Sequence, residues 1–299
     1  MRSTAAPSLS VIVATYEWPA ALDVVLRALS EQEGARFDVV IADDGSGEET
    51  AEVVGHWRSR FELEHVWQLN DRFRKARLLN QAALAARGDY LVFLDGDCLP
   101  RVGYADAIRR AALSGWFVAS KRLHLSPQFS ERIVAGSLEV WRWSSLRWAV
   151  SAPRELVTST HRQANRPGVL FPLRDRGRPW RPRGTGFRPP YNGYGYTFGV
   201  LRSDLERVNG FDMRFGGWDG EDVDIAERLL AVGLSCGWPG PAASVFHLWH
   251  ADRKQPANRI PREPRAVEAR EGLRELVAEF AAQESANRVA ASSESNEPV

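Results

Sequence analysis

The sequence has few cysteines, no surplus of one charge and no long apolar run. Cys98 and Cys236 are its two cysteines, which excludes a disulfide framework or a cysteine zinc cluster and fits a reducing compartment. Its 39 basic residues are matched by 38 acidic ones, whereas general nucleic-acid-binding proteins carry a basic excess. Residues 1–10 lack the apolar core of a signal peptide, and no apolar run reaches the ~20 residues that span a bilayer. We therefore expect a cytoplasmic protein, at most peripheral on the inner face of the membrane, that binds no nucleic acid.

The first 120 residues do have a regular alternation of strand and helix patterns. Runs rich in Val and Ile predict buried strands, and apolar residues at every third or fourth position predict helices. The expected strands are 9–14, 37–42, 62–68 and 90–94, and the expected helices between them are 19–32, 48–60 and 74–86. This order favours an α/β, Rossmann-like fold with a mostly parallel sheet and helices on both faces.

The rest of the chain divides into three parts. Residues 121–195 are rich in Trp and Arg, and we expect one helix over 130–150 followed by long loops. Regular spacing returns in 196–283, with expected strands at 196–201 and 244–249 and expected helices at 222–232 and 261–282. Residues 284–299 are polar and predict a disordered tail. A single domain with a Trp/Arg-rich insertion follows from this division.

Polar residues follow three of the expected strands, at the edge where such sheets bind ligands. They are Thr15-Tyr16-Glu17, Asp43-Asp44 and Asp95-Gly96-Asp97. Two carboxylates at the end of a buried strand are costly unless a positive group sits on them, and a divalent cation that bridges a diphosphate is one such group. Gly96 would let a ligand approach the backbone closely. The alternative is an Asp-Gly turn that simply ends the strand.

A second acidic cluster opens the expected helix 222–232. Its sequence is Gly216-Gly217-Trp218-Asp219-Gly220-Glu221-Asp222-Val223-Asp224. Acids near a helix N-terminus ordinarily act as caps or dipole partners, and this is the favoured interpretation for Asp224, which can also pair with Arg228 at i, i+4. The glycines and Trp218 suggest a mobile loop that folds over a ligand. The helix dipole would keep Asp222 ionised, as a general base for a sugar hydroxyl must be.

Two of the six histidines, His247 and His250, stand at the end of an apolar strand. Residues i and i+3 point to opposite faces of a strand, so both can reach one metal ion only if the strand ends there and the chain turns. We expect at least one of them to be a metal ligand, against the alternative of structural histidines.

Taken together, these motifs resemble known glycosyltransferases. Residues 9–46, with Ser10-Val11-Ile12-Val13-Ala14-Thr15-Tyr16 and Asp43-Asp44-Gly45-Ser46, resemble the opening of family 2 glycosyltransferases. Residues 73–80 and 93–100 are similar to β-1,4-galactosyltransferases, as is the block that runs from Val208-Asn209-Gly210-Phe211-Asp212 to Asp224. Chondroitin polymerases share that last block. The likeness covers 9–100 and 196–252, about half of the chain.

The resemblance implies a GT-A fold, an inverting mechanism and Mn²⁺, with Mg²⁺ as the second choice of ion. It implies that Asp222 is the catalytic base, that Glu221 contacts the acceptor and that Trp218 lies on a mobile loop over donor and acceptor. It implies a donor site made of Thr15, Tyr16, Asp44, Phe73, Lys75 and Asp95, and metal ligands Asp97, His250 and, where the galactosyltransferases have methionine, His247. Two departures are Lys75, in place of an arginine, and Asp219, in place of a glycine.

The implied reaction transfers a hexose or hexosamine from a UDP-sugar to a hydroxyl of a glycan or lipid-linked acceptor, in cell-envelope polysaccharide synthesis. Residues 1–120 would bind the nucleotide sugar and 196–283 would hold the catalytic and acceptor groups. The resemblance does not extend to residues 121–195, which would face the acceptor or the membrane. In the expected helix 130–150, Trp143 and Arg147 lie off or beside the apolar stripe and suit weak membrane-surface contact.

Two other functions stay open at this stage. A nucleotidyltransferase also uses paired acids and Mg²⁺ on a similar sheet, but it would carry a Gly-rich basic loop where this chain has Thr15-Tyr16-Glu17-Trp18-Pro19. A sugar-binding module without catalysis would fit the eleven tryptophans but gives no reason for Asp222, Asp95 and Asp97. A purely structural role has no positive sign in the sequence.

Overall fold

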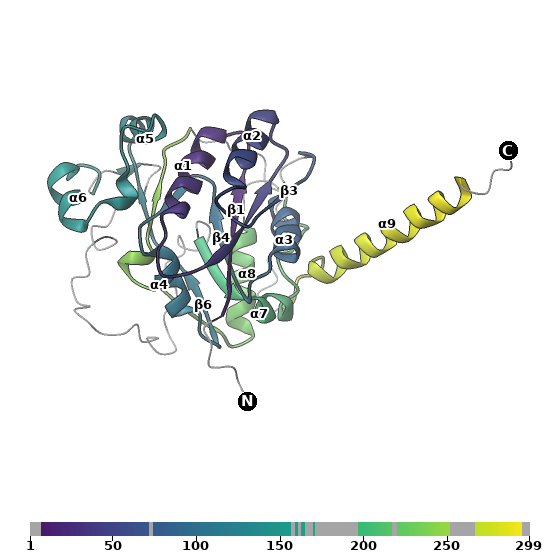
Figure 1. Ribbon diagram of the computed structural model, residues 1–299. Coiled ribbons are helices and arrows are strands. Elements are labelled where there is room, and N and C mark those ends of the chain that lie inside the picture. Colours follow the sequence, from purple (N-terminus) through teal and green to yellow (C-terminus); the bar gives the residue numbers. More distant parts are fainter. Residues whose placement is uncertain are drawn as a thin grey trace.

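The computed structural model describes residues 7–71, 74–156, 159–160, 163–164, 170, 197–216, 220–251 and 267–294, which are built around one large sheet (Figure 1). Its seven strands lie in the order β11-β6-β10-β4-β1-β2-β3. Neighbouring pairs are parallel except where β10 runs antiparallel to β4 and β6. The strands are β1 (Leu9–Thr15), β2 (Phe37–Asp43), β3 (Leu63–Trp67), β4 (Tyr90–Asp95), β6 (Trp116–Ala119), β10 (Thr197–Leu201) and β11 (Ser235–Gly237). The predicted mostly parallel sheet is confirmed.

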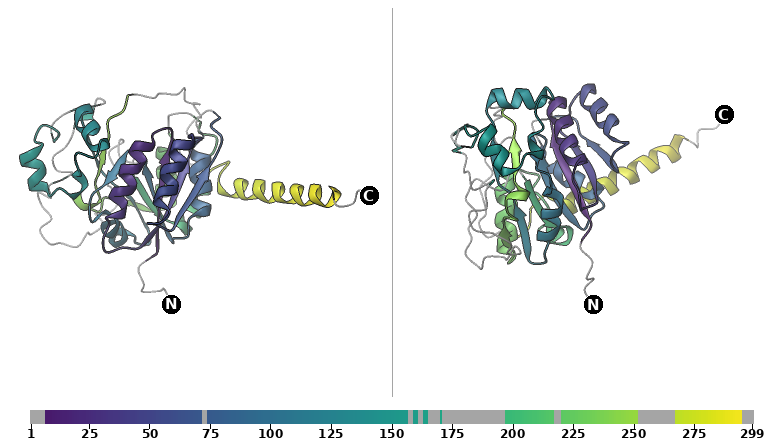
Figure 2. Two further views of the ribbon diagram at one scale, coloured as in Figure 1. Left: turned by 45° about the horizontal axis from the view of Figure 1, so that its top comes forward. Right: turned by 60° about the vertical axis from the view of Figure 1, so that its left-hand side comes forward.

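Helices cover both faces of this sheet, as Figure 2 shows from two further sides. Because side chains alternate along a strand, Val11 and Val13 of β1 pack into one core and Ile12 into the other. The first core is closed by α1 (Pro19–Ser30), α2 (Glu48–Trp57) and α4 (Tyr104–Ala111). The second is closed by α3 (Lys75–Ala85), α7 (Arg202–Arg207) and α8 (Glu221–Ala231). The helices expected at 19–32, 48–60, 74–86 and 222–232 all form.

A smaller sheet, which the sequence did not predict, stands beside the large one. It has the order β5-β12-β7, with β5 (Cys98–Pro100), β12 (Val245–His247) and β7 (Arg122–His124). β12 is shorter than the predicted strand 244–249 because the chain turns after His247, where Leu248 N donates to Asp97 O at 2.9 Å. β8 (Ser159–Thr160) and β9 (Gln163–Ala164) pair separately, and η3 (Pro241–Ala243) precedes β12.

The single helix predicted over 130–150 is wrong. The segment forms α5 (Pro127–Val134), the 3₁₀ turn η1 (Val140–Arg142) and α6 (Ser145–Ser151). Gly136 adopts a φ of 74°, which breaks the first helix, and the Ser144 hydroxyl accepts from Arg147 N at 3.2 Å to start the next. The apolar stripe still packs inward, with Trp141 and Trp148 buried, but Trp143 is buried as well and not at a free surface.

The C-terminal helix also differs from its prediction. α9 (Leu273–Glu294) begins twelve residues later than the predicted 261–282, of which 261–266 lie outside the described residues. It continues to Glu294, so residues 284–294 of the segment expected to be a disordered tail are helical, and 295–299 lie outside the described residues. Leu273 and Leu276 anchor its first turns in the body, and the later turns extend away from it (Figures 1 and 2). This extension is rich in alanine, the residue with the highest helix propensity, which favours a helix here. No helix in the described ranges combines the length and apolar character that a membrane span requires.

Candidate active site

The carboxyl ends of β1, β2 and β4 meet at one edge of the large sheet, as predicted for a ligand-binding edge. Asp44 N donates to Thr15 O at 3.1 Å, and Gly96 N donates to Ala14 O at 2.7 Å. A Cβ on residue 96 would stand 2.7 Å from Ala14 O, so only glycine fits. The backbone of Gly96 therefore approaches β1 closely, and the close approach of a ligand that the sequence suggested stays a prediction.

The end of β2 carries two buried carboxylates, Asp43 and Asp44. Gln68 Nε2 donates to Asp44 Oδ1 at 2.6 Å, and burial raises the pKa of Asp44 despite this bond. Asp43 bonds the ring of His65 (3.0 Å) and Ser46 N (2.9 Å), which keeps its pKa low although burial opposes this. His65 and Gln68 were not singled out from the sequence, and together with Asp43 they fix the loop that bears Asp44. Thr15 is buried and Tyr16 half-buried at the end of the neighbouring strand β1.

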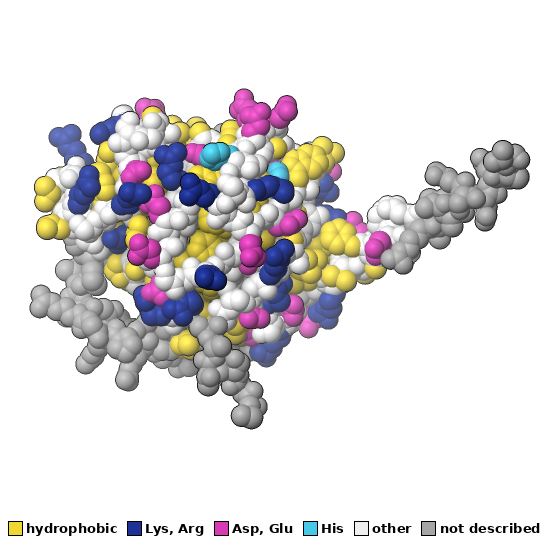
Figure 3. Space-filling view, viewed as in Figure 1, with side chains coloured by type: hydrophobic (Ala, Val, Ile, Leu, Met, Phe, Trp, Pro, Cys, Tyr) yellow, Lys and Arg dark blue, Asp and Glu magenta, His cyan; other side chains and the backbone are white. Residues whose placement is uncertain are grey.

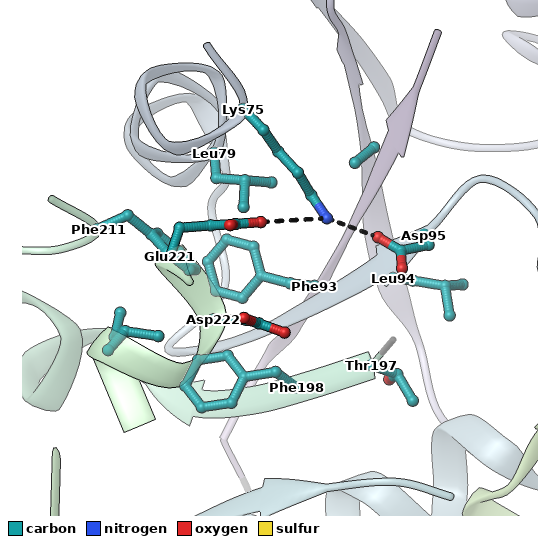
Figure 4. Close-up of a pocket in the computed structure, with 12 residues that line it drawn as sticks. Lys75, Leu79, Phe93, Leu94, Asp95, Thr197, Phe198, Phe211, Glu221 and Asp222 are labelled. Carbon is teal, nitrogen blue, oxygen red and sulfur yellow. Dashed lines mark hydrogen bonds and ion pairs between the residues drawn. The ribbon is translucent and has the colours of Figure 1, made fainter. Parts of the chain in front are cut away.

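Next to this edge, a pocket between α3, β4 and α8 is lined by one basic and three acidic side chains (Figure 4). Lys75, the first residue of α3, places Nζ 2.9 Å from Asp95 Oδ1 and 3.7 Å from Glu221 Oε1. Burial disfavours the ammonium ion, but Asp95 and Glu221 raise the pKa of Lys75 and keep it charged. Figure 4 shows Asp222 directed into the same pocket, beside Phe93 and Phe198. The predicted grouping of Lys75, Asp95, Glu221 and Asp222 therefore exists in the structure.

The two acids at the start of α8 differ in their surroundings. Burial and the charge of Asp222 raise the pKa of Glu221 to about 7, although Lys75 opposes the shift. The half-buried Asp222 accepts from Val223 N at 2.8 Å through Oδ1 and points its carboxylate to the pocket. Asp224 instead pairs with Arg228 at 2.7 Å, which confirms its structural role.

The Val208–Asp212 motif holds α8 against α3. Arg228 is 3% exposed and donates to Val208 O at 2.6 Å and to Gly210 O at 2.8 Å. Asn80 of α3 bonds both backbone groups of Phe211, at 2.8 and 2.9 Å. A Cβ on Gly210, whose φ is 68°, would stand 2.5 Å from Asn80 Oδ1. The motif thus fixes the position of Glu221 and Asp222 relative to Lys75.

Asp97, His247 and His250 converge next to this pocket. His247 Nε2 lies 3.5 Å and His250 Nε2 3.2 Å from Asp97 Oδ2, because β12 ends at His247 and the chain turns, as a shared site required. Burial lowers the pKa of His247 to about 3, so its ring is neutral at neutral pH, the form in which imidazole binds metals. The two imidazoles hold the pKa of Asp97 below its usual range, against the effect of burial. Both imidazoles thus approach one oxygen of Asp97, and a carboxylate with two imidazoles is a ligand set that suits a divalent transition-metal ion.

Two predicted site residues, Phe73 and Trp218, lie outside the described residues. Cys98 was missed: its Sγ lies 3.4 Å from Asp97 Oδ1, and the ligand atoms of Asp97, Cys98 and His247 all lie within 4.8 Å of one another. Its position directly after the Asp95-Gly96-Asp97 motif was the available signal.

Two family models match this chain. Residues 10–110 match the model described as Glycosyl transferase family 2, and residues 183–251 match the model described as N-terminal domain of galactosyltransferase. The validoxylamine A glucosyltransferase of Streptomyces hygroscopicus subsp. jinggangensis (strain 5008) is 30% identical over 237 residues, which cover 76% of this chain and 52% of that protein. The chain therefore spans about half the length of this relative.

Solved structures share the fold at low sequence identity. The mannosyltransferase PcManGT from Pyrobaculum calidifontis, in complex with GDP-Man and Mn²⁺, is 20% identical with a TM-score of 0.53 and covers 84% of this chain and 59% of its own. S. aureus TarS 1–349, in complex with UDP-GlcNAc, is 16% identical with a TM-score of 0.51 and covers 83% and 60%. These likenesses, with the family match, confirm the expected GT-A architecture.

Proposed function

The chain belongs to the glycosyltransferases, through a family 2 domain at residues 10–110 and a galactosyltransferase-type segment at 183–251, and we propose that it transfers a hexose or hexosamine from a UDP-sugar to a hydroxyl with inversion. One observation carries the proposal: three candidate metal ligands (Asp97, His247 and His250) stand beside a pocket that holds one half-buried cation and three carboxylates. Groups that could bind the donor diphosphate and groups that could activate the acceptor hydroxyl therefore lie next to one another.

The donor side of the proposal depends on charge. Loss of the diphosphate leaves negative charge on its oxygens, and Lys75 is a half-buried ammonium that can neutralise part of it. In the absence of donor this charge pairs with Asp95 and Glu221. Asp97, His247 and His250 would hold Mn²⁺, or Mg²⁺ as second choice, and a bound ion supplies further charge stabilisation for the leaving group.

The acceptor side depends on Asp222. Its carboxylate faces the pocket from the first turn of α8. As a general base it takes the proton from the acceptor hydroxyl while that oxygen attacks the anomeric carbon from the face opposite the diphosphate. Glu221 stands next to it and would accept a hydrogen bond from the acceptor.

UDP is the proposed nucleotide, with Thr15, Tyr16 and Asp44 at its base, Asp95 near its ribose and Phe73 against it. S. aureus TarS in complex with UDP-GlcNAc supports this choice, whereas the mannosyltransferase complex holds GDP-Man. The acceptor is proposed to be a glycan or a lipid-linked saccharide of the cell envelope.

The function is tested by a thermal-shift screen of UDP- and GDP-sugars with and without Mn²⁺, followed by donor hydrolysis of each hit. A ligand at 100 times its Kd stabilises by about 2.7 kcal/mol, so a UDP-sugar should raise Tm in the presence of Mn²⁺. Stabilisation by GDP-sugars alone would overturn the donor assignment. Binding without any hydrolysis or transfer would indicate a sugar-binding module, and pyrophosphate release from a sugar phosphate and UTP would indicate a nucleotidyltransferase.

The pH dependence of sugar transfer should reflect the ionisation of Glu221. Its pKa is raised to about 7 by burial and by Asp222, so below pH 7 it is protonated and above pH 7 it is the carboxylate that accepts from a hydroxyl. We therefore expect kcat/KM for the acceptor to rise with pH up to about pH 7, by up to about tenfold per unit, and then to level off. Glu221→Gln should remove this step. A step that persists in the variant would assign it to another group.

A second proposal concerns membrane contact at α6. Leu146 and Val150 are 73% and 74% exposed and share one side of the helix at i, i+4. Between them Arg147 places its guanidinium 4.7 Å over the ring of Trp143, so the indole predicted to meet lipid is covered. Hydrophobic and basic side chains meet at the left margin of Figure 3, where Figure 1 labels α6. We propose that Leu146 and Val150, with Arg147, make weak contact with an anionic membrane surface.

Sedimentation with anionic liposomes at low and high salt tests this contact. Burial of one Val or Leu side chain is worth about 1.5–3 kcal/mol, so Leu146→Ser/Val150→Ser should lower the bound fraction at low salt by at least tenfold. Val277→Ser, on the exposed part of α9 at the opposite side of Figure 1, is the matched control. No sedimentation of the wild type, or equal sedimentation of both variants, would leave α6 without this role.

A further inference from the structure

The small sheet aligns side chains that can bind metal. His247 of β12 is paired with Cys98 of β5 on one side and with His124 of β7 on the other. Residues directly opposite one another in neighbouring strands project to the same face of a sheet. The thiol and the two imidazoles therefore form one row, and all three side chains are buried.

The end of this row at Cys98 adjoins the proposed metal site. Cys98 Sγ lies 3.4 Å from Asp97 Oδ1, while Asp97 Oδ2 lies 3.5 Å from His247 Nε2 and 3.2 Å from His250 Nε2. Ligands that share one tetrahedral ion stand roughly 3.2–3.6 Å apart, given bonds of about 2.3 Å to sulfur and about 2.0 Å to nitrogen or oxygen. These three separations lie in or close to that range before any ion is bound.

The other end of the row is occupied. Arg122 Nε donates to His124 Nε2 at 3.0 Å, so this ring nitrogen is engaged by a cation. His124 packs against His247 with ring centroids 5.2 Å apart. It therefore belongs to the support of the site, and Cys98 is the one additional side chain of the row that faces Asp97.

We propose that Cys98 is a ligand of the divalent ion held by Asp97, His247 and His250, and that its sulfur raises the affinity of this site for Zn²⁺ and Co²⁺ relative to Mn²⁺. The inference rests on the metal site of the proposed function and adds a ligand to it. On ligation the thiol proton passes to solvent and the sulfur binds as thiolate. A thiolate with two imidazoles and a carboxylate is a softer set than the oxygen-rich sites that suit Mn²⁺ and Mg²⁺.

Titration of the full chain with Co²⁺ after removal of bound metal tests the proposal without any measurement of activity. The wild type should develop a near-ultraviolet thiolate-to-cobalt charge-transfer band at one equivalent. Cys236→Ser is the matched control, because Cys236 is the other cysteine of the chain, is also buried and lies on β11 of the large sheet. A band retained in Cys236→Ser can come only from Cys98, so this result decides even if Cys98→Ser fails to fold.

Where Cys98→Ser does fold, it should bind Co²⁺ without the band, and its Zn²⁺ to Mn²⁺ affinity ratio should fall by at least about tenfold. Co²⁺ bound by the wild type without the band, or a band lost in Cys236→Ser, would overturn the role of Cys98 and leave the three-residue site intact. No binding of Co²⁺, Zn²⁺ or Mn²⁺ to the wild type would overturn the metal site itself.

Discussion

Replacement of Asp222 by asparagine is expected to lower kcat by roughly 10²–10⁴-fold, the usual worth of a positioned general base, while donor affinity stays near that of the wild type. The carboxylate is directed into the pocket, and its Oδ1 accepts a hydrogen bond from Val223 N. Asparagine has the same shape and can keep that bond through its carbonyl oxygen, but it cannot take a proton. The measurement is kcat for sugar transfer together with the Kd of the donor.

Asp224→Asn is the matched control for this variant. It makes the same change in the same turn of α8, but Asp224 pairs with Arg228 behind the pocket. We expect it to lower Tm, because the 3% exposed Arg228 loses a charged partner, and to leave kcat of the folded enzyme close to that of the wild type. If Asp222→Asn kept wild-type kcat, Asp222 would be a helix-start residue like Asp224. Loss of kcat in both variants would point to the position of α8 instead of a base.

The sequence was sufficient to predict five of the seven strands of the large sheet because their signals are local, whereas the short strands β6 and β11 were not predicted. β1, β2 and β4 begin at the predicted residues and end one residue beyond them, since each is a short run of apolar residues bounded by polar ones. The small sheet could not be predicted in this way. β5, β7 and β12 have three residues each and exist through the pairing of β12 with segments that lie more than 120 residues before it in the chain.

The same distinction applies to the site. Lys75, Asp95, Glu221 and Asp222 could be named because they stand in recognisable motifs, and the structure brings them together. The contact of Gly96 with β1 could not be predicted because only the fold shows that β1 lies behind it. The exposure of Trp143 was misjudged because one continuous helix was assumed. The first helix ends near Gly136, so the residues that follow do not keep the helical spacing, and Trp143 is buried. Cys98 became a candidate metal ligand because the fold places His247 of β12 opposite it.

Removal of divalent metal is expected to abolish transfer, by roughly 10³-fold or more, because an ion at a diphosphate contributes several kcal/mol of charge stabilisation. Mn²⁺ should restore activity better than Mg²⁺ or Ca²⁺, since His247 and His250 offer nitrogen ligands that the last two ions bind poorly. Full turnover in the presence of EDTA would contradict both the metal site and the mechanism proposed for the leaving group.

The variant Asp97→Asn tests whether Asp97 binds the ion whose removal is expected to abolish transfer. Asp97 is the group that both imidazoles approach, so its replacement should weaken Mn²⁺ binding by at least about tenfold. It should weaken UDP-sugar binding in the same proportion, because donor and ion bind together in this proposal.

His56→Ala is the matched control for a lost histidine or acid. His56 lies in the last turn of α2 and is exposed, so its replacement should change neither the Kd of Mn²⁺ nor the Kd of the UDP-sugar. Calorimetric titration of Mn²⁺ with and without UDP separates the two effects. If Asp97→Asn lost donor affinity but kept Mn²⁺ affinity, Asp97 would be a direct donor contact and the ion would have to bind elsewhere.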